Sequence, residues 1–179
     1  IADSYLKFSK DSALAYMSRN RELALAMRDE EKLAKTDFAM AVLYAKTGYQ
    51  VEANDILNCK IAEYSKAVIN NRPAFHISLV MDVSPNCDCH AENDAPILPN
   101  IGMFASFDPL ALDQACVDAC LKMQPLPNSQ LFENMHREGF CDHHDHFENT
   151  TPESEYKTCL EHAEKIHLGN RNYELIVMK

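Results

Sequence analysis

The stretch "AFHISLVMDVSPNCDCH", residues 74–90, joins an apolar run to a polar loop. The run is rich in β-branched and aromatic residues and nearly continuous in apolar content, which predicts a buried strand, as in a parallel sheet. A serine–proline pair stops the strand, and Cys87, Cys89 and His90 follow at once. In α/β sheets, ligands collect just beyond the carboxyl ends of strands. The stretch therefore indicates an α/β fold with candidate ligands at the end of its first strand.

Helix-forming composition precedes this strand. Residues 1–70 are poor in Gly and Pro and rich in Ala, Leu, Met, Lys and Glu, a composition typical of helices. Apolar residues recur near helical spacing in 11–35 and again in 53–69, which indicates amphipathic packing helices. We expect a helical segment over 1–53 and an α/β domain over 54–179 that carries the C-x-C loop.

The elements after the loop complete the expected pattern. A second short strand is expected at "IGMFASF", residues 101–107, followed by a helix that Asp108 caps and Pro109 opens. A last helix is expected over 151–169, and "YELIVM", residues 173–178, closes the chain as a strand. The predicted fold class is α/β: a helical N-terminal segment followed by a small mixed or parallel sheet flanked by helices.

The charge of the chain is unevenly distributed. The whole chain has 17 Lys+Arg and 27 Asp+Glu, a formal net charge of -10, and residues 73–179 alone carry 6 against 17. A half this acidic repels phosphate backbones, and no basic stripe occurs, so nucleic acid is not an expected partner. Cations, or a protein with a basic surface such as a redox partner, fit this charge better.

Cysteine usage and hydropathy bear on the compartment. Seven cysteines is an odd number, and they lack the even framework of a small secreted scaffold. No signal segment and no apolar stretch of about 18 residues occurs, so no membrane span is expected. We expect a cytoplasmic, reducing setting with free thiols or metal ligands. Four glycines leave almost no room for a dinucleotide or phosphate-binding loop.

The first candidate site is the loop with Cys87, Cys89 and His90. A C-x-C pair on an extended loop can place both sulfurs on one ion, and the adjacent imidazole can join them if the backbone turns. Without a cation, the acidic side chains around the two thiols would oppose their ionisation, because like charges repel. A metal or cluster site therefore competes with a structural turn whose thiols are merely buried or solvated.

The histidine-rich tract "CDHHDHFE" is a second candidate. It holds Cys141, His143, His144 and His146 together with Asp142 and Asp145. They could bind a divalent metal by themselves, or fold over the C-x-C loop and supply missing ligands. A histidine-rich acidic surface loop without a bound ion is the alternative.

The blocks around the C-x-C loop resemble a known family. "VMDVSPNCDC", "DAPILPNIG" and "ASFDPLALDQA", with the closing "AEKIHLGNRNYELI", look like the C-terminal half of the uncharacterised iron–sulfur-centre proteins catalogued as domain of unknown function 362. The resemblance runs from about Asn54 to the end of the chain. It implies redox or electron-transfer chemistry, with a [4Fe–4S] cluster as the cofactor.

Members of this family usually carry an inserted ferredoxin-type module just upstream of this half, and no such cysteine run occurs here. On the resemblance, residues 1–53 are then a degenerate or misread ferredoxin-like insert. Only Cys87 and Cys89 match a family cysteine motif, so they are the cofactor-binding residues that the resemblance implies. The cluster-ligand positions of the second run fall on residues that cannot ligate iron as a thiolate does: Leu33, Thr36, Ala39 and Leu43.

Two functions follow as hypotheses. The first is an iron–sulfur or metal-centre protein of redox type, with zinc as the alternative metal. Its ligands are drawn from the two candidate sites: Cys87, Cys89, His90, Cys141, His143 and His146. The second is a non-catalytic acidic α/β interaction domain that has lost its cluster and docks a basic partner. A zinc-dependent hydrolase that uses the histidine-rich tract is a third, weaker hypothesis, because the tract has no recognisable hydrolase motif.

Overall fold

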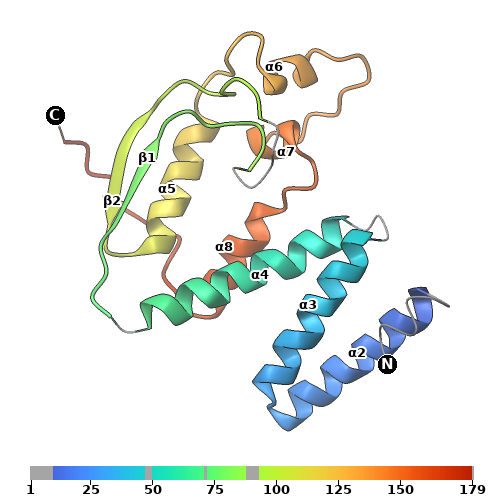
Figure 1. Cartoon of the computed structure of the whole chain (residues 1–179). Helices are drawn as coiled ribbons and strands as arrows, with labels where there is room; N and C mark the ends of the chain where they lie inside the picture. Colours follow the sequence, from blue (N-terminus) through green and yellow to red (C-terminus); the bar gives the residue numbers. More distant parts are fainter. Residues whose placement is uncertain (1–9, 47–49, 71, 88–92, 179) are drawn as a thin grey trace. The chain divides into compact units, whose positions relative to one another are not determined.

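The computed structural model describes residues 10–46, 50–70, 72–87 and 93–178. The chain divides into two compact units, an N-terminal unit of Ile1–Ile61 and a C-terminal unit of Ala62–Lys179. Helices form most of the described structure, and the C-terminal unit adds a two-stranded sheet, so the predicted α/β class is confirmed (Figure 1). The domain boundary predicted at residues 53 and 54 falls within α4, Gln50–Ile69.

The N-terminal unit is built on a pair of packed helices, α2 (Lys10–Met27) and α3 (Glu30–Lys46). Arg28, with a positive φ of 53°, turns the chain between them. Buried side chains of both helices form the core: Ala13, Met17, Met40 and Leu43. The predicted helical N-terminal segment is therefore confirmed. Leu43, where the ferredoxin pattern would need a cysteine, is a core residue 1% exposed.

The sheet consists of β1 (His76–Val80) and β2 (Gly102–Ser106). The two strands are antiparallel, with Ser78 opposite Phe104. Both strands lie where the sequence predicts them, but the prediction of a mixed or parallel sheet is wrong. A parallel pair needs a crossover connection, usually an α-helix, whereas the described residues between β1 and β2 form no helix.

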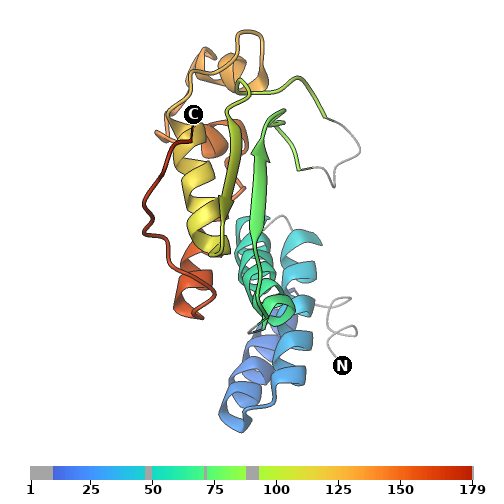
Figure 2. The ribbon, with the colours of Figure 1, turned by 90° about the vertical axis from the view of Figure 1, so that its left-hand side faces the viewer.

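The two faces of the sheet have different surroundings. α5 (Pro109–Leu121) lies against the inner face (Figure 2). The outer face consists of seven apolar side chains, every second residue along the two strands and their ends: Phe75, Ile77, Leu79, Met81, Met103, Ala105 and Phe107. Ile77 is 58% and Leu79 63% exposed, so the predicted buried strand is wrong for this face. Alternate residues of a strand point to opposite faces. Because α5 covers only the inner face, the apolar residues that point to the outer face stay exposed.

A hydrophobic core lies between the inner face and the helices of the C-terminal unit. Its buried residues are Val80, Ile97, Leu98, Cys120 and Leu131. Burial raises the pKa of the Cys120 thiol to about 11, so this cysteine packs as a small apolar side chain. Two short helices, α6 (Gln130–Met135) and α7 (His146–Thr150), follow α5 along the chain.

The last helix, α8 (Tyr156–Lys165), packs on α5 through Leu110, Leu160 and Ala163. It starts later than the predicted position at residue 151. The reason is Glu155, whose φ of 45° is left-handed and interrupts a right-handed helix just before Tyr156. The residues between α7 and α8 are therefore a turn rather than a first helical turn.

Asp108 joins the start of α5 to the chain that follows α8. Its Oδ1 accepts hydrogen bonds from the backbone N of Leu110 at 2.9 Å and of Ala111 at 3.0 Å, which confirms the predicted cap. Its Oδ2 accepts one from the backbone N of Asn170 at 2.9 Å. Gly169 lies so close that an added Cβ would stand 2.0 Å from Asp108 Oδ1. A side chain at position 169 would have to displace the Asp108 carboxylate, and glycine avoids this clash.

The segment 173–178 does not form the predicted strand. No strand and no backbone hydrogen bond of this segment occurs among the described residues. Its apolar side chains are 55% to 91% exposed. Tyr173 Oη donates a hydrogen bond to Asp118 Oδ2 at 2.7 Å, which holds the start of the segment beside α5. The backbone N–H and C=O groups of α5 are already hydrogen-bonded within the helix, so α5 cannot pair with the segment as a neighbouring strand would. A strand-forming composition is therefore not enough to make this segment a strand.

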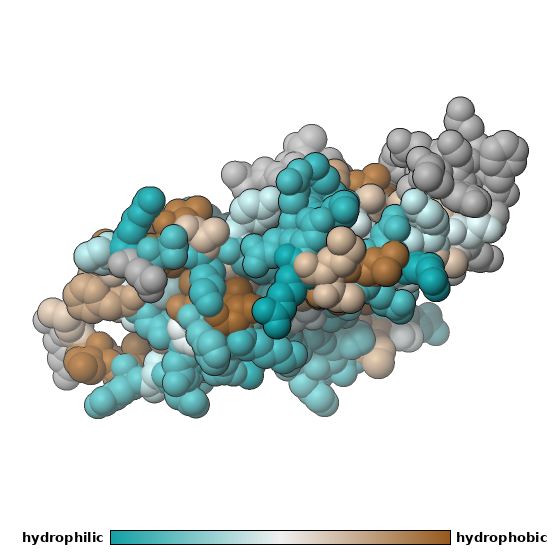
Figure 3. Space-filling view, turned by 90° about the horizontal axis from the view of Figure 1, so that it is seen from below, coloured by the Kyte–Doolittle hydropathy of each residue, from teal (hydrophilic) through white to brown (hydrophobic). Residues whose placement is uncertain are grey.

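Apolar side chains also lie on the surface of the molecule. In Figure 3, hydrophobic side chains form small groups among hydrophilic ones on the face shown. None of the helices in the described ranges combines the length and the apolarity that crossing a membrane requires. The large exposed apolar side chains belong to three N-terminal helices, to both strands and their ends, and to the segment 175–178.

Candidate functional site

The C-x-C loop leaves β1 on a base that backbone hydrogen bonds hold together. Val80 O accepts from Ile101 N at 2.9 Å, and Val83 O accepts from Ile97 N at 2.8 Å, so the two arms of the loop run side by side. Ile97 is 1% exposed and anchors the returning arm in the core. Cys87 is exposed at the end of the outgoing arm.

Only part of the predicted ligand loop is described. Cys89 and His90 lie outside the described residues. The approach to Cys87 is a short turn, in which Ser84 Oγ donates a hydrogen bond to Asn86 O at 2.8 Å. This turn sets the direction in which the chain reaches the first cysteine of the motif.

A hydrogen bond joins the C-x-C loop to the segment that follows the histidine-rich tract. Thr151 Oγ1 donates to Pro85 O at 3.2 Å. Thr151 directly follows α7, and Pro85 stands two residues before Cys87. The start of the C-x-C motif is therefore held beside the end of α7. Sequence reasoning missed this contact because it joins positions far apart in the chain.

Asp142 and Asn149 close the histidine-rich tract into a loop. Asn149 Nδ2 donates to Asp142 Oδ1 at 2.9 Å, and Asn149 Oδ1 accepts from His143 N at 2.9 Å. Asn149 is 3% exposed, so both bonds are shielded on its side. The hydrogen bonds from Asn149 and from the backbone of His144 lower the pKa of Asp142. Asp142 thus serves as an ionised acceptor that shapes the loop.

Asp145 caps α7 and ties it to α8. Its Oδ1 accepts from the backbone N of Phe147 at 2.9 Å and of Glu148 at 3.2 Å. Its Oδ2 accepts from Tyr156 Oη at 2.6 Å and lies 3.1 Å from Lys157 Nζ. Burial raises the pKa of Asp145. The hydrogen bonds from Tyr156, the Glu148 backbone and Lys157 together lower this pKa by more than burial raises it, so the pKa lies below its usual value. Asp145 is therefore ionised and fully engaged in holding the tract.

His146, the third predicted ligand of the tract, makes a hydrogen bond to the backbone. Its Nε2 lies 2.8 Å from Met123 O, and because a carbonyl only accepts, this nitrogen donates. The bond ties the start of α7 to the chain after α5. His146 does not line the cavity that Cys141 and His143 line.

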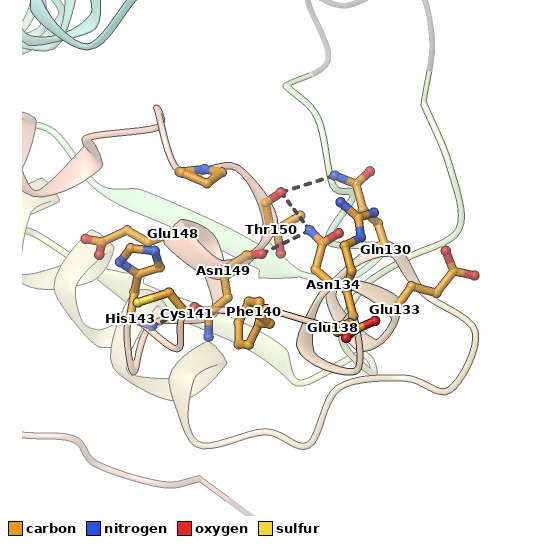
Figure 4. A pocket seen from close by; sticks show the side chains of 13 residues that line it. Gln130, Glu133, Asn134, Glu138, Phe140, Cys141, His143, Glu148, Asn149 and Thr150 are labelled. Carbon is orange, nitrogen blue, oxygen red and sulfur yellow. Dashed lines mark hydrogen bonds between the residues drawn. The ribbon is translucent and has the colours of Figure 1, made fainter.

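A cavity of about 520 Å³ lies between α6 and α7 (Figure 4). Cys141, His143 and Glu148 lie together at one end of it in Figure 4. At the other end, Asn134 Nδ2 donates to Thr150 O at 3.2 Å, as well as to the carbonyl of residue 149 at 3.0 Å. These bonds fix α6 against the end of α7, and so fix the width of the cavity.

The donors at the Cys141 end are a thiol, an imidazole and a carboxylate, the kinds of group that bind zinc. Glu148 is a lining residue that sequence reasoning missed, although it is the last letter of the quoted tract. Among the described residues, no group of three or more His, Cys, Asp and Glu side chains lies in an arrangement that could hold a metal ion. The structure thus brings Cys141 and His143 to one cavity, without a complete ligand set in the part it describes.

A family described as domain of unknown function (DUF362) matches residues 14–118, more than half of the 179-residue chain. The matched region includes β1, the C-x-C loop, β2 and most of α5, and it ends before the histidine-rich tract. No curated protein and no solved structure matches the chain. The chain belongs to the family of the domain of unknown function DUF362.

Proposed function

We propose that this chain is a metal-binding protein whose centre forms between the C-x-C loop and the cavity of the histidine-rich tract. Cys87 and Cys89 supply two thiolates, and Cys141 and His143 supply further donors. The observation that carries the proposal is the hydrogen bond from Thr151 to the carbonyl two residues before Cys87. It brings the start of the motif to the segment that ends the cavity wall.

The donor set fits zinc better than a [4Fe–4S] cluster. Such a cluster is normally held by four cysteine thiolates. Cys116 and Cys120 are packed with the core behind the sheet, and burial raises the pKa of both thiols. They are therefore poor sources of the missing thiolates. A mixed set of thiolates and imidazole instead suits Zn²⁺, which takes four Cys and His ligands in a tetrahedron.

The metal decides which role the centre has. Zinc has no redox chemistry, so a zinc centre would hold the loop and the cavity wall together or act on a bound ligand. Iron held by the same thiolates would support the electron-transfer role that the family resemblance implies. Either metal needs reduced thiols, which favours the cytoplasm as the compartment.

Metal analysis of the full chain tests the proposal. Protein purified without oxygen is expected to contain zinc or iron in stoichiometric amount by elemental analysis. A charge-transfer band near roughly 400 nm would identify thiolate-bound iron. The double variant Cys87→Ser/Cys89→Ser is expected to lose the metal, and Cys141→Ser/His143→Gln to bind it more weakly, because each removes two donors from one side of the site.

His144→Gln is the matched control for these variants. His144 belongs to the same tract and is exposed, but it does not line the cavity, so its replacement is expected to leave the metal content unchanged. Wild-type protein without zinc or iron would refute the proposal. Full metal content in Cys87→Ser/Cys89→Ser would also refute it, because the metal would then have other ligands.

A further inference from the structure

The outer face of the sheet is an exposed apolar surface of the C-terminal unit. Its six large side chains are each 48% to 80% exposed: Phe75, Ile77, Leu79, Met81, Met103 and Phe107. Together they present an apolar area on the order of 600 Å². This reaches the upper end of the largest patch on a typical monomer, and contiguous patches of this size mark interaction sites.

The polarity of β1 is inverted with respect to solvent. In a sheet with one face in water, apolar residues face the core and polar ones face out. Here the apolar Ile77 and Leu79 face out, whereas His76 and Ser78 lie on the face that α5 covers. His76 Nε2 is buried and has no hydrogen-bond partner in the described part of the chain. The face with the better core composition is thus the one left exposed.

One helix has the right dimensions to cover this face. Two strands are about 10 Å wide with their side chains, which is the diameter of one α-helix. α5 shows the fit on the other side, since this single helix covers the inner face. A sheet face this apolar is normally covered by another layer of secondary structure. The shape therefore favours an amphipathic helix as the missing layer.

The charge of the C-terminal unit selects the polar side of such a helix. Ala62–Lys179 contains 18 Asp+Glu and 8 Lys+Arg, whereas Ile1–Ile61 contains nine of each. The whole net charge of -10 therefore belongs to the unit that carries the outer face. A second copy of this chain would bring the same negative charge, which opposes self-association, while a basic partner is attracted.

We propose that the outer face is a docking surface for an amphipathic α-helix of a partner protein, with an apolar stripe against the sheet and lysines or arginines on its polar side. Ile77, Leu79 and Met103 form the middle of the surface, since Leu79 and Met103 are directly opposite across the strands. Phe75 and Phe107 close one end, with ring centroids 5.0 Å apart. Flexible methionines allow such a surface to adapt to the side chains of its partner.

The test uses a synthetic helical peptide of about 14 residues, a length that covers five-residue strands at the rise of an α-helix. The probe has leucines at helical spacing and lysines elsewhere. A second peptide has the same leucines with glutamates in place of the lysines. Binding of each labelled peptide to the full chain is followed by fluorescence anisotropy at low and at high salt.

The variant Ile77→Thr/Leu79→Thr removes the middle of the surface without a change of charge. Its matched control is Leu175→Thr/Ile176→Thr, since these side chains are 55% and 77% exposed but lie outside the outer face. The lysine peptide is expected to bind the wild type at least about tenfold more tightly than the first variant, because apolar anchors dominate such interfaces. The control variant is expected to bind like the wild type, and circular dichroism checks that both variants are folded.

Three results would overturn the proposal. Equal binding to Ile77→Thr/Leu79→Thr would show that the lysine peptide is held by charge alone, at another place. Equal or tighter binding of the glutamate peptide would show that charge does not select the partner. A dimeric wild type that the same variant converts to a monomer, with no peptide bound, would assign the face to a second copy. None of these variants touches the proposed metal ligands, so metal content reports separately on the proposed function.

Discussion

The two faces of the β1–β2 sheet are built from alternate residues of the same strands, yet one face is buried and the other is exposed to solvent. The inner face is covered by α5 and contributes Val80, 7% exposed, to the core. The outer face places Leu79, the neighbouring residue, 63% in solvent. Composition does not explain the difference, because the outer face is the more apolar of the two.

The comparison shows that burial depends on what the rest of the chain supplies to each face. The inner face is closed by segments that are distant in the sequence: α5, the returning arm of the C-x-C loop and α6 pack behind it. The described residues of the C-terminal unit supply no corresponding layer to the outer face. The same inner layer supports the C-x-C loop and the cavity wall, so the candidate site depends on one face of the sheet and the proposed docking surface on the other.

The largest effect is expected from the core behind the sheet. Leu98 is 0% exposed and packs with Val80 in the inner cluster. Leu98→Ala should lower the free energy of unfolding by about 2–5 kcal/mol, because it removes buried methyl groups and leaves a cavity. Urea denaturation followed by circular dichroism measures the change.

Leu79→Ala is the matched substitution on the outer face. Its side chain is already mostly in water, so the loss should be below about 1 kcal/mol. Similar losses for Leu98→Ala and Leu79→Ala would break the comparison, since they would mean that the outer face is covered in solution.

A smaller loss is expected where the chain after α8 meets the start of α5. A Cβ added at Gly169 would stand 2.0 Å from Asp108 Oδ1, so Gly169→Ala must displace the capping carboxylate. We expect a loss of about 1–3 kcal/mol in the free energy of unfolding. In an Asp108→Ala background the clash with the carboxylate is absent, so the same glycine substitution should cost less. Equal losses in both backgrounds would contradict the proposed contact.

Local signals placed the elements that depend on neighbouring residues. The positions of both strands and the Asp108 cap followed from short patterns, because each depends on residues within a few positions. The antiparallel pairing, the open outer face and the unpaired segment 173–178 did not follow, because they depend on which distant segment lies alongside. A nearly continuous apolar run indicates that a strand can be buried on both faces. It does not indicate whether the rest of the chain covers both faces.

The candidate site was predictable to the same extent. The sequence identified Cys141 and His143 by residue type, and both line one cavity. It could not show that His146 Nε2 is bonded to Met123 O, or that Thr151 contacts the C-x-C loop. Both bonds join residues that are distant in sequence, and no periodicity or motif reports them.

The polar contacts that hold the histidine-rich tract should make stability depend on pH. The pKa of Asp145 is lowered in the folded protein, so its contribution is present above the unfolded pKa of about 3.9 and is lost as pH falls through the folded value. Asp145→Asn keeps a capping oxygen but places an amide against Lys157. We expect it to lose about 1–2 kcal/mol at neutral pH, and the difference from the wild type to shrink below about pH 4.

Urea denaturation at several pH values measures this difference. Asp142→Asn is the control, because Asp142 also has a lowered pKa but is exposed, so a smaller pH-dependent loss is expected. A loss for Asp145→Asn that stays constant from neutral pH to about pH 2 would contradict the assignment, since it would not depend on ionisation of the carboxylate.

The smallest effect is expected on the outer face. Ile77→Thr/Leu79→Thr should change the free energy of unfolding by no more than about 0.5 kcal/mol, because threonine favours strands and both positions are exposed. Val80→Thr, one residue further along β1, should cost clearly more, because it buries a hydroxyl in the inner cluster. If the double variant were as destabilised as Val80→Thr, the outer face would already be covered by the chain itself. If the double variant instead keeps the stability of the wild type but no longer binds the lysine peptide, the inner face serves folding and the outer face serves binding.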